Sequence, residues 1–186
     1  MCTSYTSPKI KKKHRKRPVY CLSALSSLRI KLKINKKVNF WEIIDPNVSW
    51  EFLIGIFLSI FNREMWLNGL SCLDKKNIED KNIWSNFDNT CLNAKLISTV
   101  FKDKKSYICS EPLSVNLIGE REWVGLYDFI EIVRIPELID YYRSQGMSFF
   151  KYVYCKNFAL RNFFNFFTKI LINGEKAGRN YVNFYN

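Results

Sequence analysis

The sequence predicts an α+β protein that is predominantly α-helical, with a disordered basic N-terminal arm and a short amphipathic β element. Three observations lead to this prediction: a dense run of cations near the start, one strictly alternating segment at residues 28–34, and several helical patterns after residue 45. With 186 residues, 47% of them hydrophobic, the chain is long enough to bury a core. We divide it into a basic arm (1–27), an extension with an acidic middle (28–147) and a helix–turn–helix segment (148–186).

The first 20 residues are predicted to form an extended arm, in which Pro8 and Pro18 stand on either side of a cluster of basic side chains. A segment of this composition has little apolar surface to bury and becomes ordered only by binding a partner. We expect that partner to be nucleic acid; the alternatives are a targeting segment, an anionic membrane and a solvated tail. The cluster consists of Lys9, Lys11, Lys12, Lys13, His14, Arg15, Lys16 and Arg17.

Residues 28–34 alternate between apolar and basic side chains, which predicts a β-strand with one face on a core. Arg29, Lys31 and Lys33 then share the outward face. Because this face follows a basic arm, we expect it to contact phosphates; the other interpretation is an ordinary solvated strand.

Charge is distributed in three blocks along the chain. Residues 1–39 hold 12 Lys and Arg and no acid, residues 40–142 hold 10 against 16 acids, and residues 143–186 hold seven against one. A block of basic residues without acids neutralises phosphates and gains affinity from counterion release. The acidic block is repelled by such a partner, so we expect it to face solvent or neighbouring proteins.

Helix signals follow in order. Asp45 and Pro46 are typical of a helix start, and the pattern predicts one helix to about Leu67, ended by Asn68-Gly69. Its apolar stretch, Phe52 to Phe61, is too short to cross a bilayer, which takes about 20 residues. Residues 71–106 are predicted to be loop-like with a helix at 91–101, followed by strands at 107–109 and 114–118 and by helices at 125–134 and 136–146.

The last segment contains no Pro or Gly from Ser148 to Asn173, and nine of these residues are aromatic. We expect one helix over this range, a stop at Asn173-Gly174 and a second helix from about Glu175. Lys169, Lys176 and Arg179 then lie around the turn.

Catalytic and metal chemistry find little support. His14 is the single histidine, and the six cysteines are 18 or more residues apart with no CxxC pair. Glu120 with Glu122, or Asp128 with Glu131, could be paired carboxylates, but such spacings are usual for solvated charges. We expect no enzyme activity, cofactor, metal or small-molecule substrate.

Residues 166–176 resemble the first helix and turn of protein 7 of the small ribosomal subunit, the family that nucleates the head of that subunit. Phe166, Lys169, Ile170, Leu171, Gly174 and Lys176 match the family's pattern, and Val182 and Phe184 resemble the end of its next helix. Glu175 stands where the family usually has lysine, and Arg179 where it usually has a small residue.

The resemblance implies a structural protein that binds ribosomal RNA in the small subunit and contributes to head assembly. Members continue for many more residues, so it also implies a separately encoded downstream half or a truncated sequence. Phe, Tyr, Ile, Asn and Lys make up 82 of 186 residues. Their AT-rich codons indicate a strongly AT-biased genome, such as that of an organelle, and we expect a mitochondrial location. The alternative function is a membrane-peripheral or membrane-complex subunit of an organelle, with aromatic helices at the interface.

Overall fold

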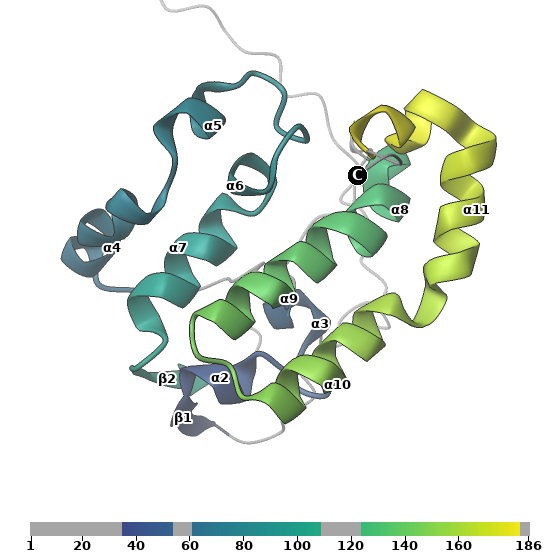
Figure 1. Cartoon of the computed structure of the whole chain (residues 1–186). Coiled ribbons are helices and arrows are strands. Elements are labelled where there is room, and N and C mark those ends of the chain that lie inside the picture. The colour runs from purple at the N-terminus through teal and green to yellow at the C-terminus, as the bar shows by residue number, and fades with distance from the viewer. Residues whose placement is uncertain (1–34, 54–60, 109–123, 183–186) are drawn as a thin grey trace, which may run out of the picture.

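The computed structural model of the chain is mostly helical (Figure 1). The residues that it describes are 35–53, 61–108 and 124–182. Within these ranges one small antiparallel sheet pairs β1 (Lys36–Asn39) with β2 (Lys105–Ile108). The predicted class, α+β with a predominance of helix, is confirmed. Three predicted features lie outside the described residues: the arm at 1–27 and the strands at 28–34 and 114–118.

A continuous helical stretch occupies the centre of the molecule. It consists of η2 (Val124–Leu126), α8 (Tyr127–Phe129), the π-helical turn η3 (Ile130–Arg134) and α9 (Ile135–Ser144). The helix start predicted at Pro136 is confirmed, since α9 has Pro136 in its first turn, and the backbone is helical on both sides of this boundary without a gap. Proline lacks an N–H group and its ring crowds the carbonyl of the preceding turn, and the wider π turn before α9 accommodates both effects. The stretch ends before Gly146, whose φ of 112° suits glycine.

The C-terminal segment forms two helices where the sequence predicts one. A 3₁₀ turn, η4 (Leu160–Asn162), joins α10 (Phe149–Ala159) to α11 (Phe163–Asn173), and α11 turns sharply away from the axis of α10 (Figure 1). Arg161 stabilises this bend, because its guanidinium donates a hydrogen bond to the Phe158 carbonyl (2.8 Å) and lies 3.9 Å from the centre of the Phe158 ring. The bend brings α11 back against α8, where Ile170 is fully buried.

The single helix predicted from Pro46 to Leu67 was also wrong. Asp45 stabilises a turn instead: its carboxylate accepts a hydrogen bond from the Asn47 N–H (2.7 Å) and its carbonyl accepts from Val48 (2.9 Å). Among residues 46–53 and 61–69, which the structure describes, the helices are α3 (Trp50–Leu53) and α4 (Arg63–Gly69). A second cap explains the start of α4, since the Asn62 side chain accepts a hydrogen bond from the Met65 N–H (3.0 Å).

The region predicted to be loop-like contains short helices. The predicted helix at 91–101 is present as α7 (Leu92–Phe101). The shorter helices were not predicted, because their few residues carry little periodicity; α5 and α6 begin at the side-chain caps Asp74 and Asn86. The short elements of this region are η1 (Leu70–Cys72), α5 (Lys75–Glu79) and α6 (Phe87–Thr90); another short helix, α2 (Phe40–Ile43), directly follows β1.

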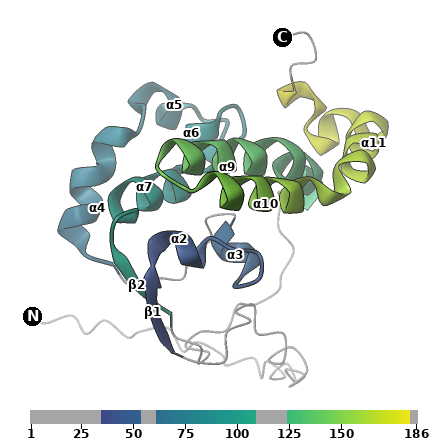
Figure 2. The same cartoon turned by 60° about the horizontal axis from the view of Figure 1, so that its bottom comes forward.

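Two hydrophobic clusters stabilise the fold. In the larger one α9 packs between α7 and α10, with α2, α3 and the sheet beneath them (Figure 2). Leu138, Ile139 and Tyr142 of α9 are fully buried there. The smaller cluster joins Phe129 of α8 to Ile170 of α11. The clusters leave two ends of the molecule, the sheet and the turn after α11, with exposed polar surfaces.

Candidate nucleic-acid interface

The predicted RNA-contacting residues fall into two groups. The structure describes Lys169, Lys176 and Arg179, which surround the turn after α11. The other eleven lie outside the described residues: Lys9, Lys11, Lys12, Lys13, His14, Arg15, Lys16, Arg17, Arg29, Lys31 and Lys33. The C-terminal three are therefore the part of the predicted interface whose geometry can be examined.

The turn after α11 depends on two glycines. Gly174 has a φ of 62° and Gly178 a φ of 85°, both in a region that side chains disfavour. The predicted helix from Glu175 was wrong: two 3₁₀ turns follow instead, η5 (Gly174–Ala177) and η6 (Arg179–Tyr181). The left-handed residue between them prevents one helix from continuing, and it places Lys176 and Arg179 in exposed positions on either side of it.

The three C-terminal cations differ in their surroundings. The Lys169 ammonium lies 3.8 Å from an Asp128 carboxylate oxygen and 5.3 Å from the centre of the Phe166 ring. Neither Lys176 nor Arg179 forms an ion pair with any residue in the described part of the chain. Lys176 and Arg179 are therefore free to meet a phosphate, whereas Lys169 is partly neutralised by its own protein.

The lysines of α10 are neutralised in the same way. Lys156 pairs with Asp140 of α9, which also accepts a hydrogen bond from the Tyr152 hydroxyl (2.8 Å). Lys151 lies 3.7 Å from the carboxylate of Asp45. Acids of the middle block thus bind lysines of the C-terminal block within the chain. Some acids of the middle block therefore contact the chain's own lysines, a role that the sequence-based expectation of a block facing solvent or neighbouring proteins did not include.

A second basic surface, which the sequence analysis missed, lies on the two-stranded sheet. Lys37 and Lys105 are exposed there, and so is Tyr107, at 67%. The register places Tyr107 directly opposite Lys37. The available signal was the pair Lys36-Lys37, which continues the basic block of the arm into β1.

Of the two carboxylate pairs considered for catalysis, Glu120 with Glu122 lies outside the described residues, and Asp128 with Glu131 occupies a structural position. The pKa of Glu131 is raised to about 7. Burial is the main cause, the positive charge of Arg161 opposes it, and the negative charge of Asp128 adds to it. Asp128 in turn is bound by Lys169. Both acids lie where η3 and α8 pack against α11. This position is that of a helix contact rather than of a catalytic cleft.

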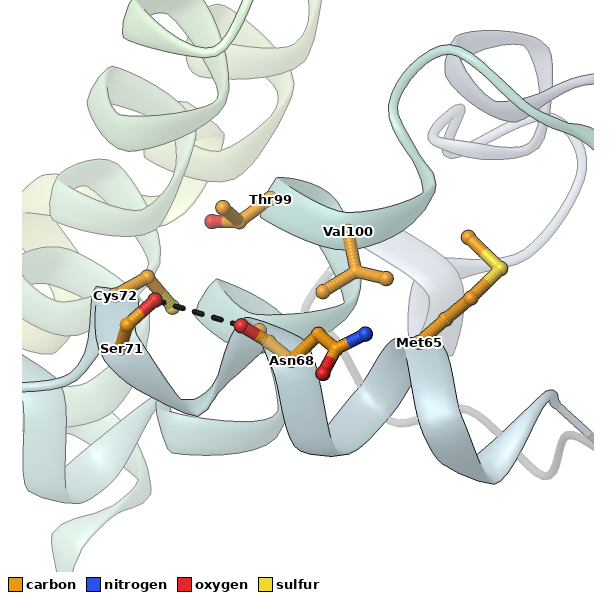
Figure 3. Close-up of a pocket in the computed structure, with 7 residues that line it drawn as sticks. Met65, Asn68, Ser71, Cys72, Thr99 and Val100 are labelled. Atoms are coloured by element: carbon orange, nitrogen blue, oxygen red, sulfur yellow. Dashed lines mark hydrogen bonds between the residues drawn. The ribbon is translucent and has the colours of Figure 1, made fainter.

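A shallow hollow of about 360 Å³ lies between α4 and α7 (Figure 3). The Ser71 hydroxyl donates a hydrogen bond to the Asn68 carbonyl (3.4 Å) at its rim. The Thr99 hydroxyl is hydrogen-bonded as well: it donates to the Lys95 carbonyl (2.8 Å) and shares a hydrogen bond with the Tyr141 hydroxyl (2.6 Å). The two hydroxyl groups that line the hollow are therefore both hydrogen-bonded within the chain. Its lining residues are Met65, Asn68, Gly69, Ser71, Cys72, Thr99 and Val100.

Thiol and metal chemistry are weakly supported among the described residues. Burial raises the pKa of Cys91 to about 12 and that of Cys155 to about 11, so both thiols stay protonated at neutral pH. No group of three or more potential metal ligands occurs within residues 35–53, 61–108 and 124–182. In those same ranges, no helix has both the length and the apolar character that a membrane span requires.

Comparisons with protein-family models, with curated protein sequences and with solved structures find no match to this chain. The resemblance of residues 166–176 to the protein 7 family stays a prediction.

Proposed function

We propose that this chain is a structural RNA-binding protein of the small subunit of a mitochondrial ribosome, where it binds ribosomal RNA and contributes to head assembly. The observation that carries the proposal is the block of 12 Lys and Arg without a single acid in residues 1–39. Such a block neutralises consecutive phosphates and releases their counterions. The interpretation of residues 166–176 as a protein 7 segment supports the choice of subunit.

The exposed cations Lys176 and Arg179 support the proposal from the other end of the chain. Phosphate contacts fix the register and orientation of a protein on RNA without reading its sequence. In this proposal the arm, with Arg29, Lys31 and Lys33 of the alternating segment, supplies most of the affinity. Lys176 and Arg179 orient the helical part, and neighbouring ribosomal proteins contact the remaining surface.

Sedimentation of an organelle lysate in magnesium tests this function. We expect the chain, detected by mass spectrometry, to migrate with the small ribosomal subunit in a sucrose gradient and to remain there after a moderate-salt wash. Migration as a free protein or with membranes contradicts the proposal.

A second candidate function, a membrane-peripheral subunit, is favoured by the exposed apolar side chains of α10 and α11. Phe150 is 87% exposed, Phe164 82% and Ile172 77%. Insertion of such side chains into a bilayer survives high salt, whereas phosphate contacts weaken steeply as salt rises. Flotation with anionic vesicles in high salt, combined with failure to bind RNA in low salt, would favour this candidate over the ribosomal one.

A further inference from the structure

The two-stranded sheet has one apolar face and one basic, aromatic face. Cross-strand partners lie on the same side of a sheet, and the register pairs Lys37 with Tyr107 and Asn39 with Lys105. All four of these side chains are exposed. On the other face, Val38 and Ile108 belong to the buried core. We call the four exposed residues, Lys37, Asn39, Lys105 and Tyr107, the sheet platform.

Tyr107 is the aromatic residue of the platform, and the fold makes little use of it. It is 67% exposed, and its ring and hydroxyl contact no other aromatic ring and accept or donate no hydrogen bond within the described residues. Lys37 is directly opposite, and Lys105 lies two residues back on the same strand face, about 7 Å along β2. Tyr107 thus has one lysine beside it across the sheet and another along its own strand.

The charge around the platform is predominantly positive. Lys37 and Lys105 form no ion pair with any described residue. Lys104 is exposed just before β2, and Lys36, which is also exposed, lies on the other face of the sheet, opposite Ile108. Two acids lie nearby: Asp103 is exposed before β2, and the Glu42 carboxylate accepts hydrogen bonds from the backbone N–H (3.3 Å) and side-chain amide (2.8 Å) of Asn39. The platform therefore has cations free for an anionic partner.

The chain also leads directly into the platform from its most basic part. Residues 1–34 carry ten Lys and Arg and no acid, and β1 begins at Lys36. Figure 2 shows β1 and β2 at an edge of the molecule, below α2 and away from α11. The most basic part of the sequence is therefore directly adjacent to the first strand of the platform.

We propose that the sheet platform binds single-stranded RNA, with an unpaired base stacked on the Tyr107 ring and flanking phosphates bound by Lys37 and Lys105. An aromatic ring between cations on a sheet surface provides the two interactions that unpaired RNA uses, base stacking and phosphate contact. A membrane would require a broader apolar surface than a single tyrosine among polar side chains. This proposal rests on the proposed function, since it names where and how the RNA is bound.

The test measures binding of a fluorescent single-stranded oligouridylate and of an RNA duplex to the full chain by anisotropy. Tyr107→Ala should weaken binding of the oligouridylate about tenfold, because one stacked base is lost, and should leave duplex binding within about twofold. Tyr107→Phe should bind as the wild type does, since it keeps the ring. Phe150→Ala, which removes an aromatic that is 87% exposed on α10, is the matched control and should change neither affinity.

The lysines are tested by the salt dependence of the same binding. Lys37→Gln combined with Lys105→Gln should reduce the slope of log affinity against log salt by about 1.4, the value for two lost contacts to a single strand. Lys75→Gln, at an exposed position on α5, should leave the slope unchanged. Far-UV circular dichroism checks that each variant remains folded.

The outcomes separate the platform from the function beneath it. Tight RNA binding by the wild type that is unaffected by Tyr107→Ala and by the double lysine variant overturns the platform and leaves the RNA-binding function standing. Equal losses in Tyr107→Ala and Phe150→Ala also overturn the platform, because the effect is then not specific to the sheet. Failure of the wild-type chain to bind either RNA overturns both proposals.

Discussion

At the level of single residues, two glycines differ in why a side chain is disfavoured at their positions. Gly146 and Gly178 both have positive φ, 112° and 85°. A Cβ at Gly146 would meet no atom within 4 Å, whereas one at Gly178 would lie 2.8 Å from Cβ and 2.9 Å from Cγ of Phe129. Gly178 therefore has two roles. It turns the chain, and its lack of a side chain lets the turn after α11 pack directly on Phe129 of the smaller hydrophobic cluster.

We expect Gly178→Ala to destabilise the protein more than Gly146→Ala. Backbone strain at either position costs about 1–3 kcal/mol, and the overlap with Phe129 adds about 1–3 kcal/mol at Gly178 alone. Urea unfolding followed by circular dichroism measures the two losses. Equal losses would show that the C-terminal turn is free to move away from Phe129.

Glu131 should make stability depend on pH. Burial raises its pKa from 4.5 to about 7, so the folded state binds this proton more tightly than the unfolded state does. The stabilising contribution of the Glu131 carboxyl to the free energy of unfolding is therefore fully present below about pH 4.5 and is lost as pH rises toward about 7. Allowing for the exposed part of the side chain, we expect a loss of about 1–2 kcal/mol.

Glu131→Gln tests this dependence, because it keeps the shape of the side chain and removes its titration. The variant should match the wild type in acid and exceed it in stability above neutral pH, as measured by thermal unfolding across a pH series. Glu79→Gln, at an exposed position of α5, is the control and should follow the wild-type profile. A Glu131→Gln profile parallel to that of the wild type would contradict the prediction.

At the level of elements, a buried ion pair joins the short helices to α7. An Asp88 carboxylate oxygen lies 2.5 Å from the Lys95 ammonium, and their side chains are 9% and 14% exposed. The other Asp88 oxygen accepts a hydrogen bond from the Asp74 N–H (3.2 Å), the cap of α5. Asp88 thus fixes α5 and α6 against α7, although neither short helix buries much surface of its own.

We expect Asp88→Asn to destabilise the protein by about 3 kcal/mol, because Lys95 is left buried without its counterion. Glu79→Gln removes a partner of the exposed Lys75 and should cost less than about 0.5 kcal/mol. Chemical denaturation of both variants gives the comparison. A loss at Asp88 as small as that at Glu79 would mean that water reaches this pair in solution.

The elements also show which features a sequence pattern can predict. Local signals predicted α7 and the end of α9 at Gly146, because periodicity and a positive-φ glycine act over a few residues. The bend at η4 was not predictable in this way. It depends on Ile170 reaching the cluster around Phe129, a contact between segments far apart in the chain. The prediction of one helix through Asn62 was wrong for the opposite reason. Asn62 is a local cap signal, but the prediction gave more weight to the apolar pattern around it.

The candidate interface divides along the same line. The sequence identifies where basic residues occur, but their free or paired state depends on tertiary contacts. Lys169 was predicted to contact RNA and lies 3.8 Å from Asp128. Tyr107 was predicted only as part of a strand, and its exposure beside Lys37 follows from a pairing of residues about 70 positions apart.

At the level of the whole molecule, the three charge blocks fold onto one another only in part. The acids Asp45, Asp128 and Asp140 bind Lys151, Lys169 and Lys156 of the C-terminal block. The C-terminal block therefore presents fewer free cations than its composition indicates. This separates lysines that hold the fold together from cations that remain available to a polyanion.

The salt dependence of RNA binding should report this separation. Lys176→Gln combined with Arg179→Gln should reduce the slope of log affinity against log salt by about 1.4, because two free cations lose their phosphates. Lys151→Gln combined with Lys156→Gln removes the same charge from α10 but should change the slope by less than half as much, since Asp45 and Asp140 already neutralise these lysines. The second pair should instead lower stability by about 1 kcal/mol. Equal slopes for the two variants would mean that RNA displaces the ion pairs of Lys151 and Lys156, and that these two lysines contact phosphates as Lys176 and Arg179 do.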